Sequence, residues 1–190
     1  MSHRVCPWWL GYFLTSPFRR WLGDAPEKIL VPYVGEGMLV LEPGPGMGFF
    51  TLELARRVGA SGRVVAVDIQ PQMLNGLRRR ARKAGLLERI DVRLAEADSL
   101  RLTDLAAKVD FVLAFAVVHE MPNANSFFSE AAKALKPGAS LLLVEPAGHV
   151  SDAHFQEELT LAAQAGLRLV NCPAIRRSHA ALLNKSKIET

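Results

Sequence analysis

The segment Val40-Leu41-Glu42-Pro43-Gly44-Pro45-Gly46-Met47-Gly48-Phe49-Phe50 decides the fold class of this sequence. It passes from an apolar run through an acid and a glycine-rich loop to a second apolar run. This order is typical of the first strand-to-helix turn of an open parallel sheet. The glycines let a ligand approach the backbone closely, and a helix that opens near Phe49 offers unpaired amide donors. The segment therefore predicts a ligand-binding turn, with a tight turn that holds no ligand as the alternative.

Strand-like and helix-like segments alternate along the whole chain. The predicted strands are Met38 to Glu42, Arg63 to Asp68, Ile90 to Leu94, Val109 to Phe115, Ser140 to Glu145, Leu167 to Asn171 and Ala180 to Leu183. The predicted helices are Phe50 to Val58, Gln72 to Ala84, Asn125 to Leu135 and Ala153 to Ala165, the third of them ended by Lys136-Pro137-Gly138. The pattern predicts an α/β fold with a doubly wound, Rossmann-like sheet that is mostly parallel. The last two strands are close enough in sequence to form an antiparallel C-terminal hairpin.

Length and composition indicate one compact domain. The chain has 190 residues, of which 49% are hydrophobic and 22% charged, enough for one sizeable core and too few for two comfortable domains. We expect a single domain over residues 1–190, with an aromatic segment at 1–25 and a Rossmann-like core at 26–190. Cys6 and Cys172 form neither a disulfide framework nor a metal-ligand cluster, which favours a reducing, cytoplasmic location.

The net charge of +4 comes largely from one basic segment, Arg78-Arg79-Arg80-Ala81-Arg82-Lys83. The segment has helical character, so a solvated helix face explains it better than a nucleic-acid patch. No apolar run approaches the roughly 20 residues of a membrane span.

A second acid, Asp68, indicates which class of ligand the glycine loop binds. Asp68 ends the second predicted strand 26 residues after Glu42, near the spacing at which a carboxylate binds ribose hydroxyls. A dinucleotide fingerprint requires glycine at its sixth position, where this sequence has Phe49, so nicotinamide binding is disfavoured. Glu42 beside the loop suits a ligand with ammonium and sulfonium charge better than a pyrophosphate, although a purely structural carboxylate stays an alternative.

Five ordered motifs resemble the class I S-adenosylmethionine-dependent methyltransferases: Leu39 to Gly48, Asp68-Ile69, Ala95 to Leu100, Asp110 to Glu120 and Leu135 to Glu145. The resemblance implies S-adenosyl-L-methionine as cofactor, with Asp68 on the ribose, Ile69 packed on adenine and Asp98 accepting from the adenine amino group. The residues that we expect at the cofactor are Glu42, Gly44, Pro45, Gly46, Gly48, Asp68, Ile69, Asp98, Ser99 and Phe115.

The sequence disfavours several subclasses of that family. The Asn/Asp-Pro-Pro-aromatic tetrapeptide of many nucleobase amino-methyltransferases is replaced by Phe115-Ala116-Val117-Val118. The Pro-Cys nucleophile of cytosine C5 enzymes is missing, because both cysteines precede prolines. Arsenite methylation would require more than two thiols. A small-molecule methyl acceptor is therefore the expected partner, and nucleic acid is not.

Few residues near the predicted methyl-transfer site could accept a proton from the substrate. In-line methyl transfer needs a base only when the nucleophile arrives protonated. We predict His119 and Glu120, just after the fourth strand, as the catalytic residues, acting as a base or as a substrate contact. A hydrogen-bonded structural histidine is the alternative for His119, and a solvated acid is the alternative for Glu120. His149, in the loop after the fifth strand, is a substrate-site candidate. No ligand spacing there predicts a metal.

The N-terminal segment contains all three tryptophans of the chain. We predict that Trp8, Tyr12 and Phe13 line the substrate site as part of an apolar lid. Peripheral contact with a membrane surface and plain packing on the domain are the alternatives. The overall expectation is a methyltransferase of a small, partly apolar molecule, acting as a monomer or homodimer. A nicotinamide-dependent oxidoreductase and a non-catalytic adenosyl-ligand-binding protein are the competing functions.

Overall fold

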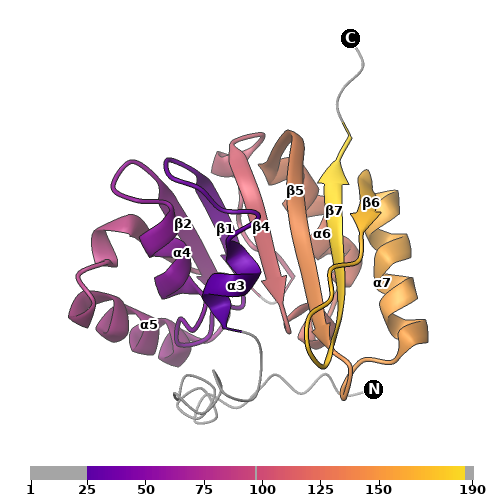
Figure 1. Cartoon of the computed structure of the whole chain (residues 1–190), viewed down its shortest axis with the longest axis horizontal. Coiled ribbons are helices and arrows are strands. Elements are labelled where there is room, and N and C mark those ends of the chain that lie inside the picture. Colours follow the sequence, from indigo (N-terminus) through magenta and orange to yellow (C-terminus); the bar gives the residue numbers. More distant parts are fainter. Residues whose placement is uncertain (1–24, 97, 187–190) are drawn as a thin grey trace.

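The computed structural model describes residues 25–96 and 98–186. These residues form one seven-stranded sheet with helices on both faces (Figure 1). Its elements are α3 (Pro26–Leu30), β1 (Leu39–Pro43), α4 (Thr51–Arg57), β2 (Arg63–Asp68), α5 (Pro71–Lys83), η1 (Leu87–Arg89), β3 (Ile90–Leu94), η2 (Thr103–Leu105), β4 (Val109–Phe115), η3 (Val118–Glu120), α6 (Ala124–Ala134), β5 (Leu135–Pro146), α7 (Asp152–Gln164), β6 (Leu167–Asn171) and β7 (Ser178–Lys185).

The strand order is β3-β2-β1-β4-β5-β7-β6. The first five strands pair in parallel, whereas β7 is antiparallel to both β5 and β6. The chain reverses its direction of travel across the sheet between β1 and β4, and an open sheet binds ligands at the carboxyl ends of the strands beside such a point. In Figure 1 these ends lie at the lower edge, toward which the arrowheads of β4 and β5 point.

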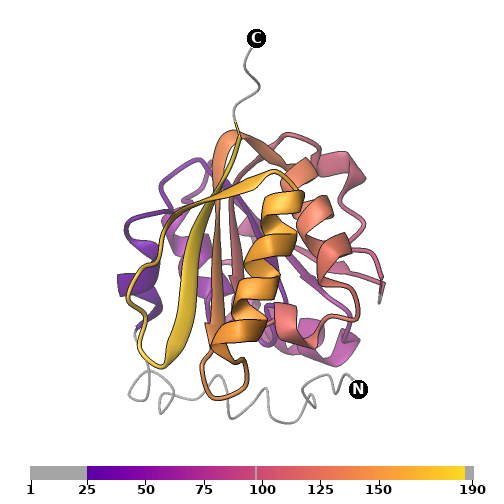
Figure 2. The same ribbon diagram turned by 90° about the vertical axis from the view of Figure 1, so that its right-hand side faces the viewer.

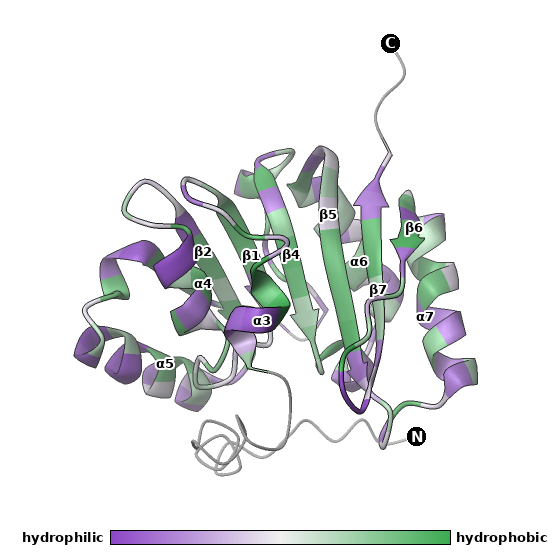
Figure 3. Ribbon diagram, in the orientation of Figure 1, coloured by the Kyte–Doolittle hydropathy of each residue, from purple (hydrophilic) through white to green (hydrophobic). Residues whose placement is uncertain are grey.

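Each face of the sheet carries its own apolar core because neighbouring residues of a strand point to opposite faces. Val40 packs with α3, α4 and α5 on one face, and Leu41 packs with α6 and α7 on the other. Figure 2 shows α6 and α7 on one side of the sheet and α3 on the other. The buried strands β4 and β5 are hydrophobic along most of their length, whereas α5 is largely hydrophilic (Figure 3), as expected for a helix packed on one side only.

The predicted strands, helices and terminal hairpin are confirmed, with two differences. The segment Lys136-Pro137-Gly138 does not follow the helix as a separate turn, because α6 ends at Ala134 and β5 already begins at Leu135. Its pairing with β4 is irregular there, with Leu135 opposite Val109 and Ser140 opposite Phe111. The short helix α3 was not predicted from the sequence.

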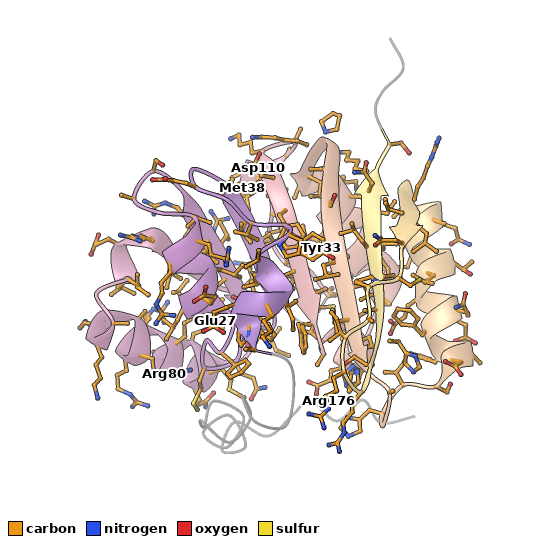
Figure 4. All side chains as sticks on the ribbon, in the orientation of Figure 1. Glu27, Tyr33, Met38, Arg80, Asp110 and Arg176 are labelled. Atoms are coloured by element: carbon orange, nitrogen blue, oxygen red, sulfur yellow. The ribbon has the colours of Figure 1, made fainter. Side chains whose placement is uncertain are left out.

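The irregular stretch of β5 is held by polar contacts at the end of the sheet away from the ligand-binding edge. Asp110 accepts a hydrogen bond from the Leu39 backbone amide at 2.9 Å and pairs with the Lys136 ammonium. Figure 4 shows Asp110 and Met38 at this upper edge, with Arg80 at the lower one. Within residues 25–96 and 98–186, no helix is long and apolar enough to cross a membrane.

Candidate active site

A cavity of about 480 Å³ opens at the carboxyl ends of the parallel strands. Its wall joins the loop after β1, the end of β2, the loop after β3 and the segment that follows β4. Among the predicted cofactor residues, those on the wall are Gly44, Pro45, Gly46, Asp68, Ile69, Asp98, Ser99 and Phe115. His119, Glu120 and His149 line the same cavity. Residues far apart in the sequence are therefore brought to one site.

The glycine loop is shaped by close packing at two of its glycines and by open space at a third. A Cβ atom on Gly44 would lie 2.3 Å from a methyl carbon of Val117, and one on Gly48 would lie 2.4 Å from a methyl carbon of Leu77. Gly46 has φ +55°, and a Cβ atom there would meet nothing within 4 Å. Gly48 is not on the cavity wall. Gly46 instead leaves room that a side chain would fill.

The glycine loop is also tied to α5. The Arg80 guanidinium donates a hydrogen bond to the backbone carbonyl of Met47 at 2.5 Å. The buried Met47 side chain packs against Gly76, where a Cβ atom would lie 2.8 Å from its Cγ. Arg80 is thus part of the support of this loop rather than of a free basic surface.

Asp68 ends β2 beside the glycine loop and is buried. Its two carboxylate oxygens accept hydrogen bonds from the backbone amides of Gln70, at 2.9 Å, and Gly46, at 3.3 Å. Burial raises the pKa of Asp68 to about 6, and these amides oppose the shift. Asp68 lies on the cavity wall, and its role as the acid that binds ribose hydroxyls stays a prediction.

Glu42 lies in β1 beside the glycine loop and is not on the cavity wall. It is only 4% exposed, and its Oε2 atom has no hydrogen-bond partner among the described residues. Burial raises the pKa of Glu42 to about 8, and the Thr51 hydroxyl opposes this shift. A buried oxygen without a partner beside a glycine cradle fits a cationic ligand group, which would supply the missing hydrogen bond.

The loop after β3 is fixed to α6. Glu130 accepts hydrogen bonds from the Leu100 amide, at 3.1 Å, and from the Ser99 hydroxyl, at 3.4 Å. Ser126 donates to the Asp98 carbonyl at 3.2 Å. These contacts leave the side chain of Asp98 exposed on the cavity wall.

His119 carries the most specific contacts of the transfer-site candidates. Its Nδ1 atom is hydrogen bonded to Oε2 of Glu145, which is fully buried at the end of β5. Its Nε2 atom lies 3.9 Å from Oε1 of Glu120. Burial lowers the pKa of His119, but the hydrogen bond to Glu145 and the charges of Glu145, Glu120 and Glu158 outweigh it, so the net pKa is raised.

The remaining candidates lie around this histidine. The rings of His119 and His149 are 6.1 Å apart, and the ring of Phe115 packs at 4.3 Å on Phe50. Ala116, between β4 and η3, has φ +54°, a conformation that costs free energy for any residue with a Cβ atom and occurs often at functional sites. The turn at Ala116 carries the chain from the sheet into η3, where His119 lies.

Sequence reasoning missed Glu145, Glu130 and Arg80 as parts of the site. Glu145 had one usable signal, an acid placed at the carboxyl end of a wholly apolar run. Trp8, Tyr12 and Phe13 lie outside the described residues. Within the part of the chain that the structure describes, no cluster of three or more His, Cys, Asp or Glu side chains could hold a metal ion.

The doubly wound sheet and this site define a class, the Rossmann-like S-adenosylmethionine-dependent methyltransferases. A family described as "Methyltransferase domain" matches residues 35–186, and the chain belongs to this family. A crystal structure of an S-adenosylmethionine-dependent methyltransferase from Aquifex aeolicus superposes with a TM-score of 0.83 and 27% identity, covering 95% of this chain and 99% of that one.

Curated relatives match a shorter part of the chain. The ubiquinone/menaquinone biosynthesis C-methyltransferase UbiE of Hydrogenovibrio crunogenus is 31% identical over 109 residues, 57% of this chain and 42% of its own length. The arsenite methyltransferase of Halobacterium salinarum is 31% identical over 107 residues, 56% of this chain and 27% of its own length. The matched region thus spans less than half of either relative.

Proposed function

We propose that this protein transfers the methyl group of S-adenosyl-L-methionine to a small, partly apolar molecule. The observation that carries the proposal is the shared cavity, which joins the glycine loop and Asp68 to His119 and His149. One side of the cavity has the glycine cradle and acids expected for an adenosyl ligand. The other side has a histidine in a defined hydrogen bond.

The chain's own residues would position the reactants. Gly46 leaves room for the ligand at the backbone, Asp68 would accept from ribose hydroxyls, and the partnerless oxygen of Glu42 suits the ammonium group. S-adenosyl-L-methionine supplies the electrophilic methyl group when bound. In-line displacement then depends mainly on holding the nucleophile and this group in line.

The acceptor side of the cavity combines apolar and polar walls. Val117, Met121 and Pro122 contribute apolar surface, and His119 and Glu120 contribute polar groups. This mixture supports a partly apolar acceptor with one polar atom at the reacting end. His119 and Glu120 are positioned to contact that atom, and either could take its proton.

Three observations argue against a nicotinamide cofactor, a nucleic-acid substrate and an arsenite acceptor. A nicotinamide oxidoreductase remains disfavoured, because Phe49 occupies the sixth position of the glycine fingerprint. Arg78 and Arg80 donate hydrogen bonds to the carbonyls of Val92 and Met47, which supports a helix face rather than a nucleic-acid patch. Cys172 is exposed and absent from the cavity wall, which supports an organic acceptor over arsenite.

The N-terminal aromatic segment stays a proposal for the substrate side. Its removal through Trp21 should weaken capture of the acceptor more than binding of the cofactor, because the described cofactor cradle lies within residues 42–130. Equal retention of both would count against a lid.

Calorimetric titration with S-adenosyl-L-methionine, S-adenosylhomocysteine and NAD tests the cofactor assignment. We expect binding of the first two and none of NAD. A Glu42→Gln variant should lose affinity for S-adenosyl-L-methionine and keep its fold. Binding of NAD alone would contradict the proposal.

A non-catalytic adenosyl-binding protein is tested separately by turnover. Incubation with labelled S-adenosyl-L-methionine and a library of small phenols, quinols and amines should give a methylated product. A His119→Asn variant should lower that turnover and leave cofactor affinity unchanged. Tight binding without any turnover would favour the non-catalytic reading.

A further inference from the structure

Glu145 connects the sheet to the transfer site through both of its carboxylate oxygens. It is fully buried at the end of β5. Its Oε1 atom accepts a hydrogen bond from the Val118 backbone amide at 2.8 Å, and its Oε2 atom is hydrogen bonded to Nδ1 of His119. One buried carboxylate therefore fixes both the backbone of η3 and the imidazole that η3 carries.

This geometry determines which nitrogen of His119 is available for chemistry. A carboxylate beside Nδ1 favours the tautomer in which Nδ1 carries the proton and Nε2 carries the lone pair. Glu145 is not on the cavity wall, whereas His119 is. Nε2 is therefore the nitrogen left to face the cavity, with Oε1 of Glu120 at 3.9 Å.

The acidic groups around His119 stabilise the imidazolium ion that forms when His119 accepts a proton. Glu145 faces it from β5, Glu120 from η3 and Glu158 from α7, while His149 faces it from the loop after β5. Glu158 is 2% exposed, and burial followed by the charge of Glu145 raises the pKa of Glu158 to about 8. At neutral pH Glu158 therefore keeps its proton, so the negative charges that favour protonated His119 are those of Glu145 and Glu120.

We propose that Glu145 is a positioning residue that holds His119 with Nδ1 protonated, so that Nε2 takes a proton from the methyl acceptor. The inference rests on the proposed methyltransferase function and deepens it, because it names an acceptor that arrives protonated, such as a phenol or quinol hydroxyl. The acceptor O–H bond breaks and its proton moves to Nε2. The oxygen bonds to the methyl carbon while the carbon–sulfur electron pair stays on sulfur.

Nuclear magnetic resonance of the imidazole nitrogens tests this assignment directly. The full chain is labelled with ¹⁵N-histidine, and the His119 signals are identified by their loss in a His119→Asn variant. We expect the neutral His119 of the native protein to carry its proton on Nδ1. In a Glu145→Gln variant we expect that preference to weaken and the titration midpoint of His119 to fall by about one pH unit.

A Glu157→Gln variant is the matched control. It removes one acid from α7 that is 74% exposed and lies 3.5 Å from His154. It should shift the signals of His154 and leave those of His119 unchanged. If Glu145→Gln does not fold, the native spectrum still decides, because a neutral His119 protonated on Nε2 overturns the proposal.

Calorimetry with S-adenosyl-L-methionine on the same samples distinguishes the proposed role of Glu145 from the proposed methyltransferase function. Binding together with an Nε2-protonated His119 would refute only the role of Glu145. An Nδ1-protonated His119 without cofactor binding would support the pair and refute the methyltransferase function on which the acceptor class depends.

Discussion

The carboxylate of Asp68 accepts a hydrogen bond from the backbone amide of Gly46 at 3.3 Å, so the end of β2 is tied to the glycine loop after β1. The second carboxylate oxygen accepts from the Gln70 amide at 2.9 Å. Asp68 is thus already organised as an acceptor on the cavity wall. Its raised pKa, about 6 because of burial, makes the charge of this acceptor depend on pH in a measurable range.

We expect the affinity for S-adenosyl-L-methionine to rise as pH increases through about 6. Below that value Asp68 is protonated and accepts hydrogen bonds from ribose hydroxyls less well. An Asp68→Asn variant should bind more weakly at pH 7.5, by roughly 1.5 to 3 kcal/mol. Titration calorimetry at pH 5 and pH 7.5 measures both effects. A native protein and variant that respond identically to pH would remove Asp68 from the cofactor site.

Ionisation of Asp68 should lower the stability of the free protein, although it should raise the affinity for the cofactor. A folded-state pKa above the ordinary value of 3.8 means that the contribution of Asp68 to stability is fully present below pH 3.8 and is lost as pH rises through about 6. Buried ionisation at this site therefore destabilises the free protein while it favours binding.

Gly46 and Gly85 form a matched pair for testing the cradle. Both have positive φ, +55° and +67°, and a Cβ atom on either would meet nothing within 4 Å, but only Gly46 lines the cavity. Substitution of each by alanine should cost a similar 1 to 2 kcal/mol in the free energy of unfolding, since both strain the backbone. Only Gly46→Ala should also reduce cofactor affinity, by about tenfold or more. Thermal unfolding and calorimetry measure the two quantities, and an equal effect of both variants on affinity would contradict a ligand at Gly46.

Arg80 and Arg82 allow a comparison at constant charge. The Arg80 guanidinium donates to the Met47 carbonyl, whereas Arg82 is exposed on the same helix. Arg80→Met should loosen the glycine loop and lower cofactor affinity several-fold, because a hydrogen bond from a charged group contributes about 1.5 to 3 kcal/mol. Arg82→Met removes the same charge and should leave affinity unchanged. If calorimetry gives the two variants the same affinity for S-adenosyl-L-methionine, the hydrogen bond between Arg80 and Met47 does not support cofactor binding.

The sequence predicted the order of elements, and eight of the ten residues that it assigned to the cofactor line the cavity, because both depend on local signals. The glycine loop, the acid that ends β2 and the apolar runs are each visible within one short segment. Glu42 and Gly48 were predicted at the cofactor, but neither is on the cavity wall, so their contact with a ligand stays a prediction. Whether Glu42 and Gly48 face the cavity depends on how α4 and α5 pack against the sheet. The sequence pattern of one strand does not encode that packing.

The supporting contacts of the site could not be predicted for a related physical reason. Glu145 accepts a hydrogen bond from His119, and Glu130 accepts one from the Leu100 amide, so these contacts join residues 26 and 30 positions apart. They exist because β5 lies beside β4, and α6 lies over the loop that follows β3. The insertion of β7 between β5 and β6 is likewise a choice of sheet order, which the hairpin pattern leaves open.

Glu158 provides a test of the buried charge beneath the site. It is 2% exposed, and neither carboxylate oxygen has a hydrogen-bond partner among the described residues, although Nε2 of His154 lies 3.5 Å from its Oε1. Burial raises the pKa of Glu158 to about 8. Its contribution to stability is therefore fully present below its ordinary value of 4.5 and is lost as pH rises through about 8. A Glu158→Gln variant cannot ionise, so its free energy of unfolding should fall less between pH 5 and pH 9, by about 4 kcal/mol. Glu157→Gln, on the exposed side of α7, should follow the native profile. Urea denaturation at pH 5, 7 and 9 measures the three profiles, and a Glu158→Gln profile parallel to the native one would show that Glu158 ionises without cost.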